Sequence, residues 1–423
     1  MRVLIVNTSE NTGGAAVASN RLMAALNNNG VKAKMLVKDK QSAQITVVGL
    51  KHGLRQQWHF LWERWCIFWH LHLHRDHLFE IDLGNEGNDI TRLPEYREAD
   101  IIHLAWINQG MLSLKDIRRI LRSGKPVVWT MHDLWPATGI CHYPRGCKAF
   151  CSGCGRCRLL PGGGAPNDLS ARVFKKKLQL YHDSNIRFVA CSRWLEQQAR
   201  ESRLMQGQRL TSIPNTIDTN VFRPIDKKES RFRAGLPADK KVILFVSQRV
   251  TDERKGMKYF VEALEQLVKN HPEIKEQSCV AILGGHSEEI THELPLPTYP
   301  LGYINDERRI INIYNASNVY VLPSLEDNLP NTIMEAMACG VPCVSFAVGG
   351  IPEMIDHMEN GFLAPPRDAE KMAEGIWWTL SVATDKVSQS AVTKVMQKYS
   401  AASVAMQYIE VYNEALALKN YHL

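Results

Sequence analysis

Residues 323–353 read PSLEDNLPNTIMEAMACGVPCVSFAVGGIPE, which is the pattern of a strand end, a loop, a helix and a second strand. Asp327 falls in the predicted loop, and Glu335 falls in the predicted helix eight positions later. In an open parallel α/β sheet, ligands bind at the loops after the strands and at the helix starts that follow. The stretch therefore predicts an α/β fold and a small-molecule site whose acids accept hydrogen bonds from hydroxyl groups.

The residues around these acids indicate the kind of ligand. Asn331 and Thr332 open the predicted helix with capping chemistry, and the free amide groups of a helix start bind phosphate oxygens. Glu335, one turn further in, disfavours phosphate but accepts paired hydrogen bonds from a ribose or sugar diol. Gly349 and Gly350 allow a close backbone approach. Phosphate and diol together predict a nucleotide sugar; the alternative is an acid at a helix start and a solvated helix acid, with no ligand.

This segment resembles the acid-x7-Glu signature of the family 4 retaining glycosyltransferases, which have the GT-B fold of two facing Rossmann-like domains with a cleft between them. The resemblance implies that Glu335 holds the nucleotide ribose and that Asp327 binds hydroxyls of the donor sugar. The family usually has Glu at the first position and a glycine-rich run after it, so the sugar identity stays open. The donor-binding residues implied here are Asp327, Asn328, Leu329, Glu335, Gly349 and Gly350.

Length and composition indicate a folded protein of two domains. The chain has 423 residues, which is too long for one core, with 45% hydrophobic and 22% charged residues. The start, MRVLIVNTSE, is interpreted as a buried strand rather than a signal peptide, and no apolar run reaches the roughly 18 residues of a membrane span. We therefore expect a cytoplasmic protein that contacts a membrane, if at all, from inside.

Charge is distributed unevenly along the chain. Residues 1–220 hold 30 Lys and Arg against 18 Asp and Glu, whereas the remainder holds 21 against 26. A basic half favours an anionic partner. No nucleic-acid-binding motif is present, so a phosphorylated acceptor or an anionic membrane surface is the better prediction, and no nucleic acid is expected.

Strand and helix patterns alternate twice along the chain, which predicts two parallel sheets covered by helices. Predicted strands are 3–7, 31–37, 101–104, 127–131, 188–191, 242–247, 280–284, 319–322 and 341–346. Predicted helices are 15–27, 257–269, 307–315, 332–339 and 401–417. The predicted organisation is an acceptor-side domain 1–216, a linker 217–236, a nucleotide-sugar-binding domain 237–400 and a C-terminal helix 401–423, which the resemblance implies crosses back to the first domain.

Two cations follow the first strand of the second domain. Arg249 and Lys255 can grip a diphosphate and stabilise the charge that grows on a departing nucleotide. The resemblance assigns both to the donor diphosphate, with Arg254 as a less certain neighbour; solvated loop charges are the alternative. Because two cations already neutralise the leaving group and no Asp-x-Asp motif is present, no metal is expected in catalysis.

Two features of the first domain belong to the expected reaction centre. Gly13 and Gly14 open a helix after the first strand, where backbone amides can approach an anion or the reacting sugar. The resemblance places a His near the reacting carbon, which selects His132, with His103 as a second candidate. It also implies retention of anomeric configuration by front-face attack, without a covalent intermediate. The catalytic residues expected are therefore His132, Asp327, Arg249 and Lys255.

Five of the ten cysteines fall within residues 141–157. Cys141, Cys147, Cys154 and Cys157 form C-x5-C-x6-C-x2-C, whose last pair is a common zinc knuckle, with His142 as a substitute ligand and Cys151 left over. The surrounding sequence resembles a subgroup of bacterial polysaccharide (colanic-acid-type) glycosyltransferases that carry a Cys-rich insertion. A structural zinc and a loop of reduced thiols are both consistent with this pattern.

Tryptophans 58, 62, 65 and 69 recur at spacings of four, three and four, which places them on one face of a helix. Lys51, Arg55, Arg64 and Arg75 surround them. Packing against the first sheet explains such a face, and so does an interfacial helix on an anionic membrane.

The whole pattern favours a glycosyltransferase that moves a sugar from a UDP- or GDP-linked donor to a glycan or lipid-linked acceptor in bacterial cell-envelope polysaccharide synthesis. The alternatives are a non-catalytic scaffold that binds nucleotide sugar, or a nucleotide-sugar epimerase on the same fold.

Overall fold

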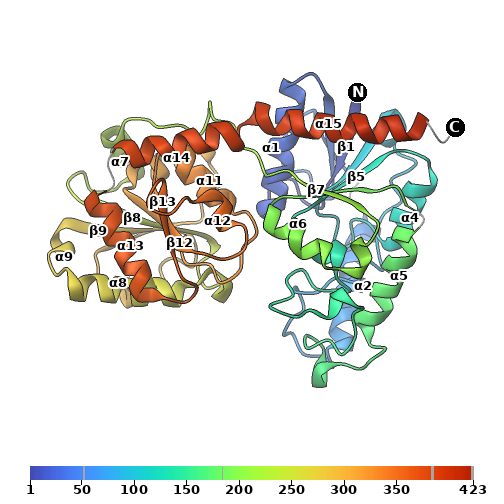
Figure 1. Ribbon diagram of the computed structural model, residues 1–423, viewed down its shortest axis with the longest axis horizontal. Helices are drawn as coiled ribbons and strands as arrows, with labels where there is room; N and C mark the ends of the chain where they lie inside the picture. Colours follow the sequence, from blue (N-terminus) through green and yellow to red (C-terminus); the bar gives the residue numbers. More distant parts are fainter. Residues whose placement is uncertain (51–52, 183, 383–384, 421–423) are drawn as a thin grey trace. The chain divides into compact units, whose positions relative to one another are not determined.

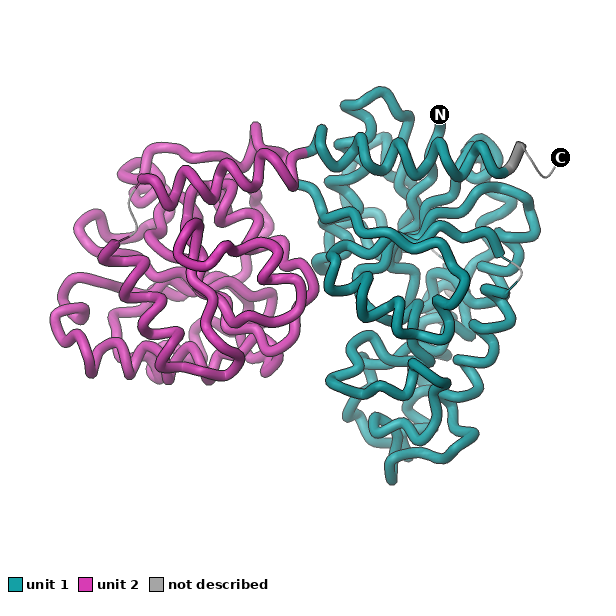
Figure 2. Tube along the Cα trace, viewed as in Figure 1, with its two compact units in different colours: residues 1–216, 401–423 teal, residues 217–400 magenta. Residues whose placement is uncertain are grey.

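The computed structural model describes residues 1–50, 53–182, 184–382 and 385–420. The chain divides into two compact units: residues 1–216 with 401–423, called unit 1, and residues 217–400, called unit 2 (Figure 2). None of the helices in the described ranges has the length and apolar content needed to cross a membrane.

Unit 1 is built on a seven-stranded parallel sheet of order β3-β2-β1-β4-β5-β6-β7. Its central strands are buried runs of branched apolar residues, as expected for a parallel sheet covered on both faces. The strands are β1 (Arg2–Val6), β2 (Lys32–Val37), β3 (Val47–Gly49), β4 (Ile101–Leu104), β5 (Val127–Met131), β6 (Arg187–Ala190) and β7 (Arg209–Ser212). The helices are α1 (Gly14–Asn28), α2 (Leu54–His70), α3 (Pro94–Glu98), α4 (Leu114–Arg122), α5 (Leu169–His182), α6 (Arg193–Arg200) and α15 (Ala401–Asn420). Short 3-10 helices are η1 (Trp135–Ala137), η2 (Ala149–Cys151), η3 (Pro161–Gly163) and η4 (Arg203–Met205).

The last helix, α15, packs beside α1 on the sheet of unit 1 (Figure 1). Val404, Ala405, Tyr408 and Tyr412 are buried in the same core as β1 and β2. Tyr412 and Tyr408 also reach hydroxyl and imidazole partners on β4 and β5. The end of the chain is therefore an integral part of the first core.

Unit 2 holds a six-stranded parallel sheet of order β10-β9-β8-β11-β12-β13. Its strands are β8 (Lys241–Arg249), β9 (Ser278–Gly285), β10 (Thr298–Gly302), β11 (Val319–Leu322), β12 (Cys343–Phe346) and β13 (Gly361–Ala364). Its helices are α7 (Lys227–Ala234), η5 (Glu253–Lys255), α8 (Met257–Asn270), α9 (Ile274–Gln277), η6 (Thr291–Glu293), α10 (Glu307–Ala316), α11 (Asn331–Ala338), α12 (Ile351–Met354), α13 (Ala369–Val382) and α14 (Asp385–Lys398). Both units are thus Rossmann-like, as the sequence predicted.

The segment predicted as a linker, 217–236, is built into unit 2. It contains α7, and Arg231 of that helix donates hydrogen bonds to the carbonyls of Ala316 and Ala238 and to the Asn318 side chain. The charge-rich composition of this segment suggested a linker, but Arg231 connects α7 to the end of α10 through its hydrogen bonds. Unit 2 consequently begins at residue 217.

Candidate functional site

The loop between β11 and α11 carries a buried, charged carboxylate. Asp327 is 8% exposed, and the Lys255 ammonium donates to its Oδ2 at 2.5 Å. Arg254 Nη1 lies 3.8 Å from the same oxygen, and the Ser324 hydroxyl lies 3.3 Å from it. Burial acts to raise the pKa of Asp327, but the two cations outweigh it and hold that pKa below its usual range. The carboxylate is therefore ionised and ready to accept hydrogen bonds.

A second loop brings these cations to the acid. Arg254 and Lys255 lie in η5, between β8 and α8, and the Leu325 amide donates to the Arg254 carbonyl at 2.9 Å. Gly256 ends this turn in a left-handed conformation with φ of 73°, and a Cβ there would lie 1.9 Å from the Pro323 carbonyl oxygen. Only glycine permits the two loops to approach so closely.

Glu335 lies one turn inside α11 and is 9% exposed. The Tyr314 hydroxyl donates to its Oε2 at 2.9 Å, and burial together with the charge of Glu335 raises the pKa of Tyr314 well above its usual value. Tyr320 donates to the Thr332 hydroxyl at 2.8 Å, and its pKa is raised by burial first and by the charges of Asp327 and Glu335 among the further causes. The two acids are thus carried by the same loop and helix, with Tyr314 bound to Glu335 and Tyr320 bound to Thr332 at the helix start.

The start of α11 differs from the sequence expectation. The N-cap position is occupied by Pro330, which has no side-chain acceptor, and no side-chain cap forms. Thr332 instead accepts the hydrogen bond of Tyr320. Asn331 is the first residue of the helix rather than its cap. The predicted capping role was wrong because the proline occupies the capping position.

A glycine turn closes the site from the β12–α12 loop. Gly349 has φ of 59°, and a Cβ on it would lie 1.6 Å from the Asp327 carbonyl oxygen. The Gly350 amide donates to the Asn328 carbonyl at 2.8 Å, and the side chains of Asn328 and Leu329 are buried. The two glycines thus support the acid-bearing loop through its backbone.

Arg249 is exposed at the end of β8, in register with Gly285. Within the described ranges, the ion pairs recorded for Asp327 are those with Lys255 and Arg254. Arg254, the less certain neighbour in the sequence, is therefore the arginine at the acid. Tyr314 and Tyr320 were missed, because one precedes Glu335 by 21 residues and the other lies within a buried strand; neither has a sequence signal for contact with the acids.

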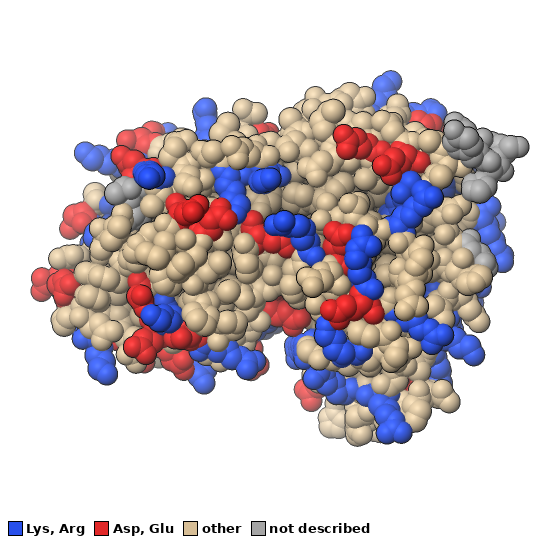
Figure 3. All heavy atoms as spheres, in the orientation of Figure 1, with Lys and Arg blue, Asp and Glu red and all other residues tan. Residues whose placement is uncertain are grey.

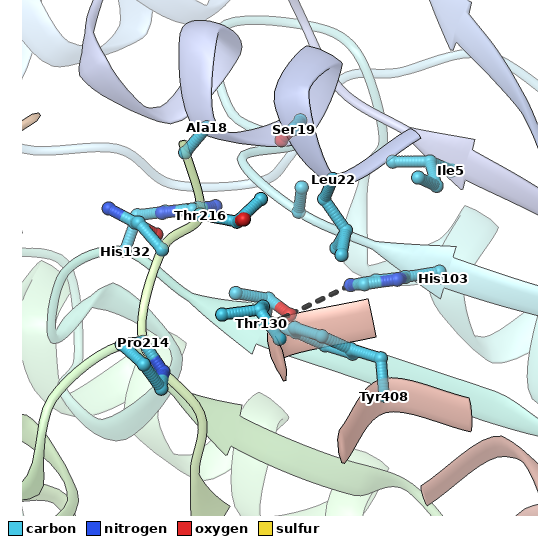
Figure 4. A pocket seen from close by; sticks show the side chains of 13 residues that line it. Ile5, Ala18, Ser19, Leu22, His103, Thr130, His132, Pro214, Thr216 and Tyr408 are labelled. Carbon is cyan, nitrogen blue, oxygen red and sulfur yellow. Dashed lines mark hydrogen bonds between the residues drawn. The ribbon is translucent and has the colours of Figure 1, made fainter. Parts of the chain in front are cut away.

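In unit 1, His132 follows β5 directly, at the edge of the sheet where α1 begins after β1. It lines a cavity of about 10 Å³, room for about one water, with Thr130, His103 and Ser19 among the other lining residues (Figure 4). Burial lowers the pKa of His132 to about 4, despite the opposing charge of Asp133. The imidazole is therefore neutral near pH 7.

His103, the second candidate, is fully buried in the core of unit 1. Its Nδ1 is 2.6 Å from the Tyr412 hydroxyl and its Nε2 is 2.7 Å from the Thr130 hydroxyl, the contact drawn in Figure 4. Burial lowers its pKa to about 3, with the charge of His132 as the further cause. Both ring nitrogens are used, so His103 links the sheet to α15.

The predicted helix start after β1 is present. Gly13 is the N-cap of α1 with φ of 90° and ψ of 160°, and α1 begins at Gly14. No side chain caps this start. A left-handed φ favours glycine at position 13, and the turn carries backbone amides at the edge of the sheet.

His142 is engaged in a buried charge network. Its Nε2 is 2.6 Å from Asp82 Oδ2 and its Nδ1 is 2.8 Å from Asp133 Oδ2. Both ring nitrogens thus lie within hydrogen-bond distance of a carboxylate. These contacts link His142 to the loop that carries His132, and its role as a substitute zinc ligand stays a prediction.

The cysteines of residues 141–157 are free thiols. Burial raises the pKa of Cys141 to about 11 and that of Cys154 to about 12. The charges of Cys157 and Cys147 also raise the pKa of Cys141. The Gly139 amide donates to the Cys154 sulfur at 3.2 Å. Across the described ranges, no group of three or more His, Cys, Asp or Glu side chains is gathered to hold a metal ion. The zinc at Cys141, Cys147, Cys154 and Cys157 stays a prediction.

Each unit matches a family model of known proteins. Residues 12–221 match the family model described as Glycosyltransferase Family 4, and residues 240–381 match that of Glycosyl transferases group 1. D-inositol 3-phosphate glycosyltransferase of Thermobispora bispora is 26% identical over 221 residues, 49% of this chain and 51% of the relative, so the match spans about half of that relative's length. An uncharacterized glycosyltransferase of Methanocaldococcus jannaschii is 25% identical over 80% of this chain and 90% of its own.

Solved structures show the same fold. HepE of Anabaena in complex with UDP-glucose superimposes with a TM-score of 0.64 and 18% identity over 98% of this chain and 100% of its own. Three observations are consistent with a glycosyltransferase of this fold: the two parallel sheets, the acid pair with its cations, and the two family matches. The chain is therefore similar to family 4 glycosyltransferases over most of its length, and its fold is GT-B.

Proposed function

We propose that this protein transfers a sugar from a nucleoside diphosphate donor to a hydroxyl of a glycan or lipid-linked acceptor. The observation that carries the proposal is the Lys255–Asp327 ion pair beside the buried Glu335 in unit 2. An ionised acid in contact with a lysine provides an acceptor for sugar hydroxyls next to a donor for phosphate oxygens. The UDP-glucose complex of HepE supports a nucleotide-sugar ligand for this fold.

The donor diphosphate would bind at the β8–α8 loop. Lys255 and Arg254 lie there, and Arg249 is exposed at the end of the preceding strand. As a diphosphate draws Lys255 away, Asp327 loses its partner and becomes available to hydroxyls of the sugar. Glu335, held by Tyr314 through one oxygen, would accept from the ribose diol. Lys255 and the arginines then stabilise the negative charge of the departing nucleotide.

We infer a retaining, metal-independent reaction by front-face attack. Lys255 and Arg254 would neutralise the charge of the leaving group, so that step does not call for a metal ion. His132, with its pKa lowered to about 4, would act in transfer as a neutral imidazole, which can donate or accept a hydrogen bond without adding charge. An NMR assignment of the product's anomeric configuration checks retention; an inverted product would contradict it.

The acceptor and the place of action extend the same proposal. The basic half of the chain favours an anionic acceptor, such as a phosphorylated or lipid-diphosphate-linked glycan. We place the protein in the cytoplasm, at the inner face of a membrane, in bacterial polysaccharide synthesis. A scaffold that binds nucleotide sugar without transfer is the alternative from another class, and it would keep the same acid and cations.

Thermal stabilisation by a panel of UDP- and GDP-sugars tests donor binding. Glu335→Gln is the informative variant, because the amide oxygen still accepts from Tyr314 while the charge and one acceptor for the diol are lost. Glu359→Gln, at an exposed acid of the same unit, is the matched control. A shift that Glu335→Gln abolishes and Glu359→Gln retains supports the donor site; equal shifts in both variants would refute the role of Glu335.

Transfer itself separates the enzyme from the scaffold. Donor consumption in the presence of membrane extract or defined glycan acceptors, with Lys255→Ala as the negative control, measures turnover. Binding that persists without any donor consumption would favour the scaffold.

A further inference from the structure

Helix α2 presents its aromatic side outward. Trp58, Trp62, Trp65 and Trp69 are between 41% and 63% exposed, and Leu61 between them is 57% exposed. Packing of this face against the sheet, one of the two interpretations of the sequence, is therefore wrong. Phe79, after the helix, is a further exposed aromatic. We call Trp58, Leu61, Trp62, Trp65 and Trp69 the tryptophan face.

The opposite side of α2 is buried and carries charged residues beside the apolar Ile67, which is fully buried. Glu63 and Arg64 are only 1% and 6% exposed, and His59 is 8% exposed. A helix at the surface of a soluble protein normally turns its charges to water and its large apolar residues to the core. In α2 the larger aromatic residues face water instead, while Glu63 and Arg64 are buried beside Ile67.

Specific contacts fix the rotation of α2. Glu63 Oε1 accepts from the amides of Leu83 and Gly84 at 3.0 and 2.9 Å. Arg64 donates to the Leu78 carbonyl at 2.6 Å and pairs with Asp82, which in turn contacts His142. Turning the tryptophans inward would break all of these buried pairs, each of which is costly to lose. The exposed face is thus enforced by the charge network beneath it.

The surface next to this helix is strongly basic. Ile81 pairs with Cys141 in an antiparallel bridge, and Arg145 contacts Glu80 at 3.1 Å, so the segment after α2 lies beside the Cys-rich loop. Residues 141–182 hold eight Lys and Arg and one acid. The exposed cations of this range are Arg145, Lys148, Arg156, Arg158, Arg172, Lys175 and Lys176. Figure 3 shows Lys and Arg gathered over this part of unit 1, where acids are few.

We infer that the tryptophan face and its basic surroundings dock unit 1 on an anionic membrane surface. Trp rings settle at the depth of the headgroups, and a helix with one aromatic face lies in the plane of the interface. Cations at the same surface attract anionic lipid. The four tryptophans span about 16 Å of helix, at about 1.5 Å per residue, which suits a flat surface better than a pocket for one anchor. Arg75, exposed just after α2, adds to the positive charge; Lys51 lies outside the described residues, and so does the side chain of Arg55.

The membrane partner rests on the proposed function, whose lipid-linked acceptor lies there, whereas the exposed face belongs to α2 alone. The charge around the tryptophan face distinguishes among the partners that could bind it. A protein partner or a second copy of this chain does not require basic residues around the face, and a second copy would also bring two basic surfaces together. An anionic lipid surface complements both the rings and the cations.

Vesicle flotation of the full chain tests the inference. We expect binding to vesicles of phosphatidylglycerol and phosphatidylcholine, at least about tenfold weaker binding to phosphatidylcholine alone, and weakening with salt. Trp58→Ser with Trp65→Ser and Trp69→Ser should reduce binding to the anionic vesicles about tenfold or more. Phe232→Ser, which removes an 87% exposed ring from unit 2, is the control and should leave binding unchanged.

The charge contribution has its own pair of variants. Arg75→Glu with Arg156→Glu should weaken vesicle binding, whereas Lys258→Glu with Lys371→Glu, two exposed lysines of unit 2, should not. Circular dichroism confirms folding, and thermal stabilisation by donor sugars is measured on every variant. Wild-type protein that fails to float while donor binding persists would overturn membrane docking and leave the proposed function standing. Dimers that the tryptophan substitutions dissociate, without vesicle binding, would assign the face to a second copy and overturn it as well.

Discussion

Replacing Lys255 by Met isolates the ion pair on which the proposed donor site depends. At 2.5 Å and an effective dielectric constant of about 20, the attraction between Lys255 and Asp327 is about 7 kcal/mol before desolvation is counted. Arg254, 3.8 Å from the same oxygen, keeps about 4 kcal/mol of attraction in the variant. Losing one partner of a buried pair costs about 3–5 kcal/mol, and because Arg254 remains, we expect about 3 kcal/mol for Lys255→Met.

A double-mutant cycle distinguishes the pair from general damage. Asp327→Asn leaves Lys255, whose side chain is 19% exposed, able to reach water, so about 1–2 kcal/mol should be lost. With both substitutions neither charge is stranded, and the loss should be about 2 kcal/mol, well below the sum of the single losses. Calorimetry should show the transition of unit 2, residues 217–400, lowered by about 6–12 °C in Lys255→Met, at roughly 2–4 °C per kcal/mol. Additive losses, or a shift under about 2 °C, would refute the coupling.

Three further predictions concern pH, backbone and metal. Burial lowers the pKa of His103 to about 3 and that of His132 to about 4, so below pH 6.5 the unfolded chain binds more protons than the folded one. The free energy of unfolding should therefore fall as pH falls from about 6.5 toward 4, and His103 alone should account for about 2 kcal/mol of the loss by pH 5. If the melting temperature of His103→Gln depended on pH as steeply as that of the wild type, this reasoning would be contradicted. Gly349→Ala should abolish donor stabilisation, because its Cβ would overlap the Asp327 carbonyl, whereas Gly302→Ala, also at positive φ but with no atom near its Cβ, should cost only about 1 kcal/mol and retain donor binding. Elemental analysis should find one zinc per chain, lost in Cys154→Ser with Cys157→Ser; zinc-free protein with four freely titrating thiols at Cys141, Cys147, Cys154 and Cys157 would remove the structural zinc.

Sequence periodicity located the central strands of both sheets and missed the strands at their edges. β3 and β7 border the first sheet, and β10 and β13 border the second. Central parallel strands are continuous apolar runs because both of their faces are covered. Among the edge strands, β7 alternates exposed and buried residues as RLTS, whereas β13 is mostly buried but only four residues long. A short stretch of that kind is indistinguishable from a loop without its neighbours.

The candidate site was predictable where the chemistry is local. Asp327 and Glu335 share one loop and helix, and Lys255 follows a recognisable strand. Contacts between distant segments could not be predicted, because nothing in the sequence links Tyr314 to Glu335, or His142 to Asp82 sixty residues earlier. Helical spacing likewise placed the tryptophans on one face of α2 but could not tell which face the protein buries; the partners of Glu63 and Arg64 decide that.

The return of α15 to the first core makes unit 2 an insertion within unit 1. Its two ends are adjacent, since Ile217 and Ser400 form a parallel bridge and the Ile217 amide donates to the Tyr399 carbonyl at 2.9 Å. Truncation after residue 216 would strip Tyr408 and Tyr412 from Thr130 and His103, and would leave those buried groups without partners. A short linker from residue 216 to residue 401 would instead close unit 1 on itself. Each unit could then be produced separately, provided that the cut follows this nested chain path rather than the linear order of the sequence.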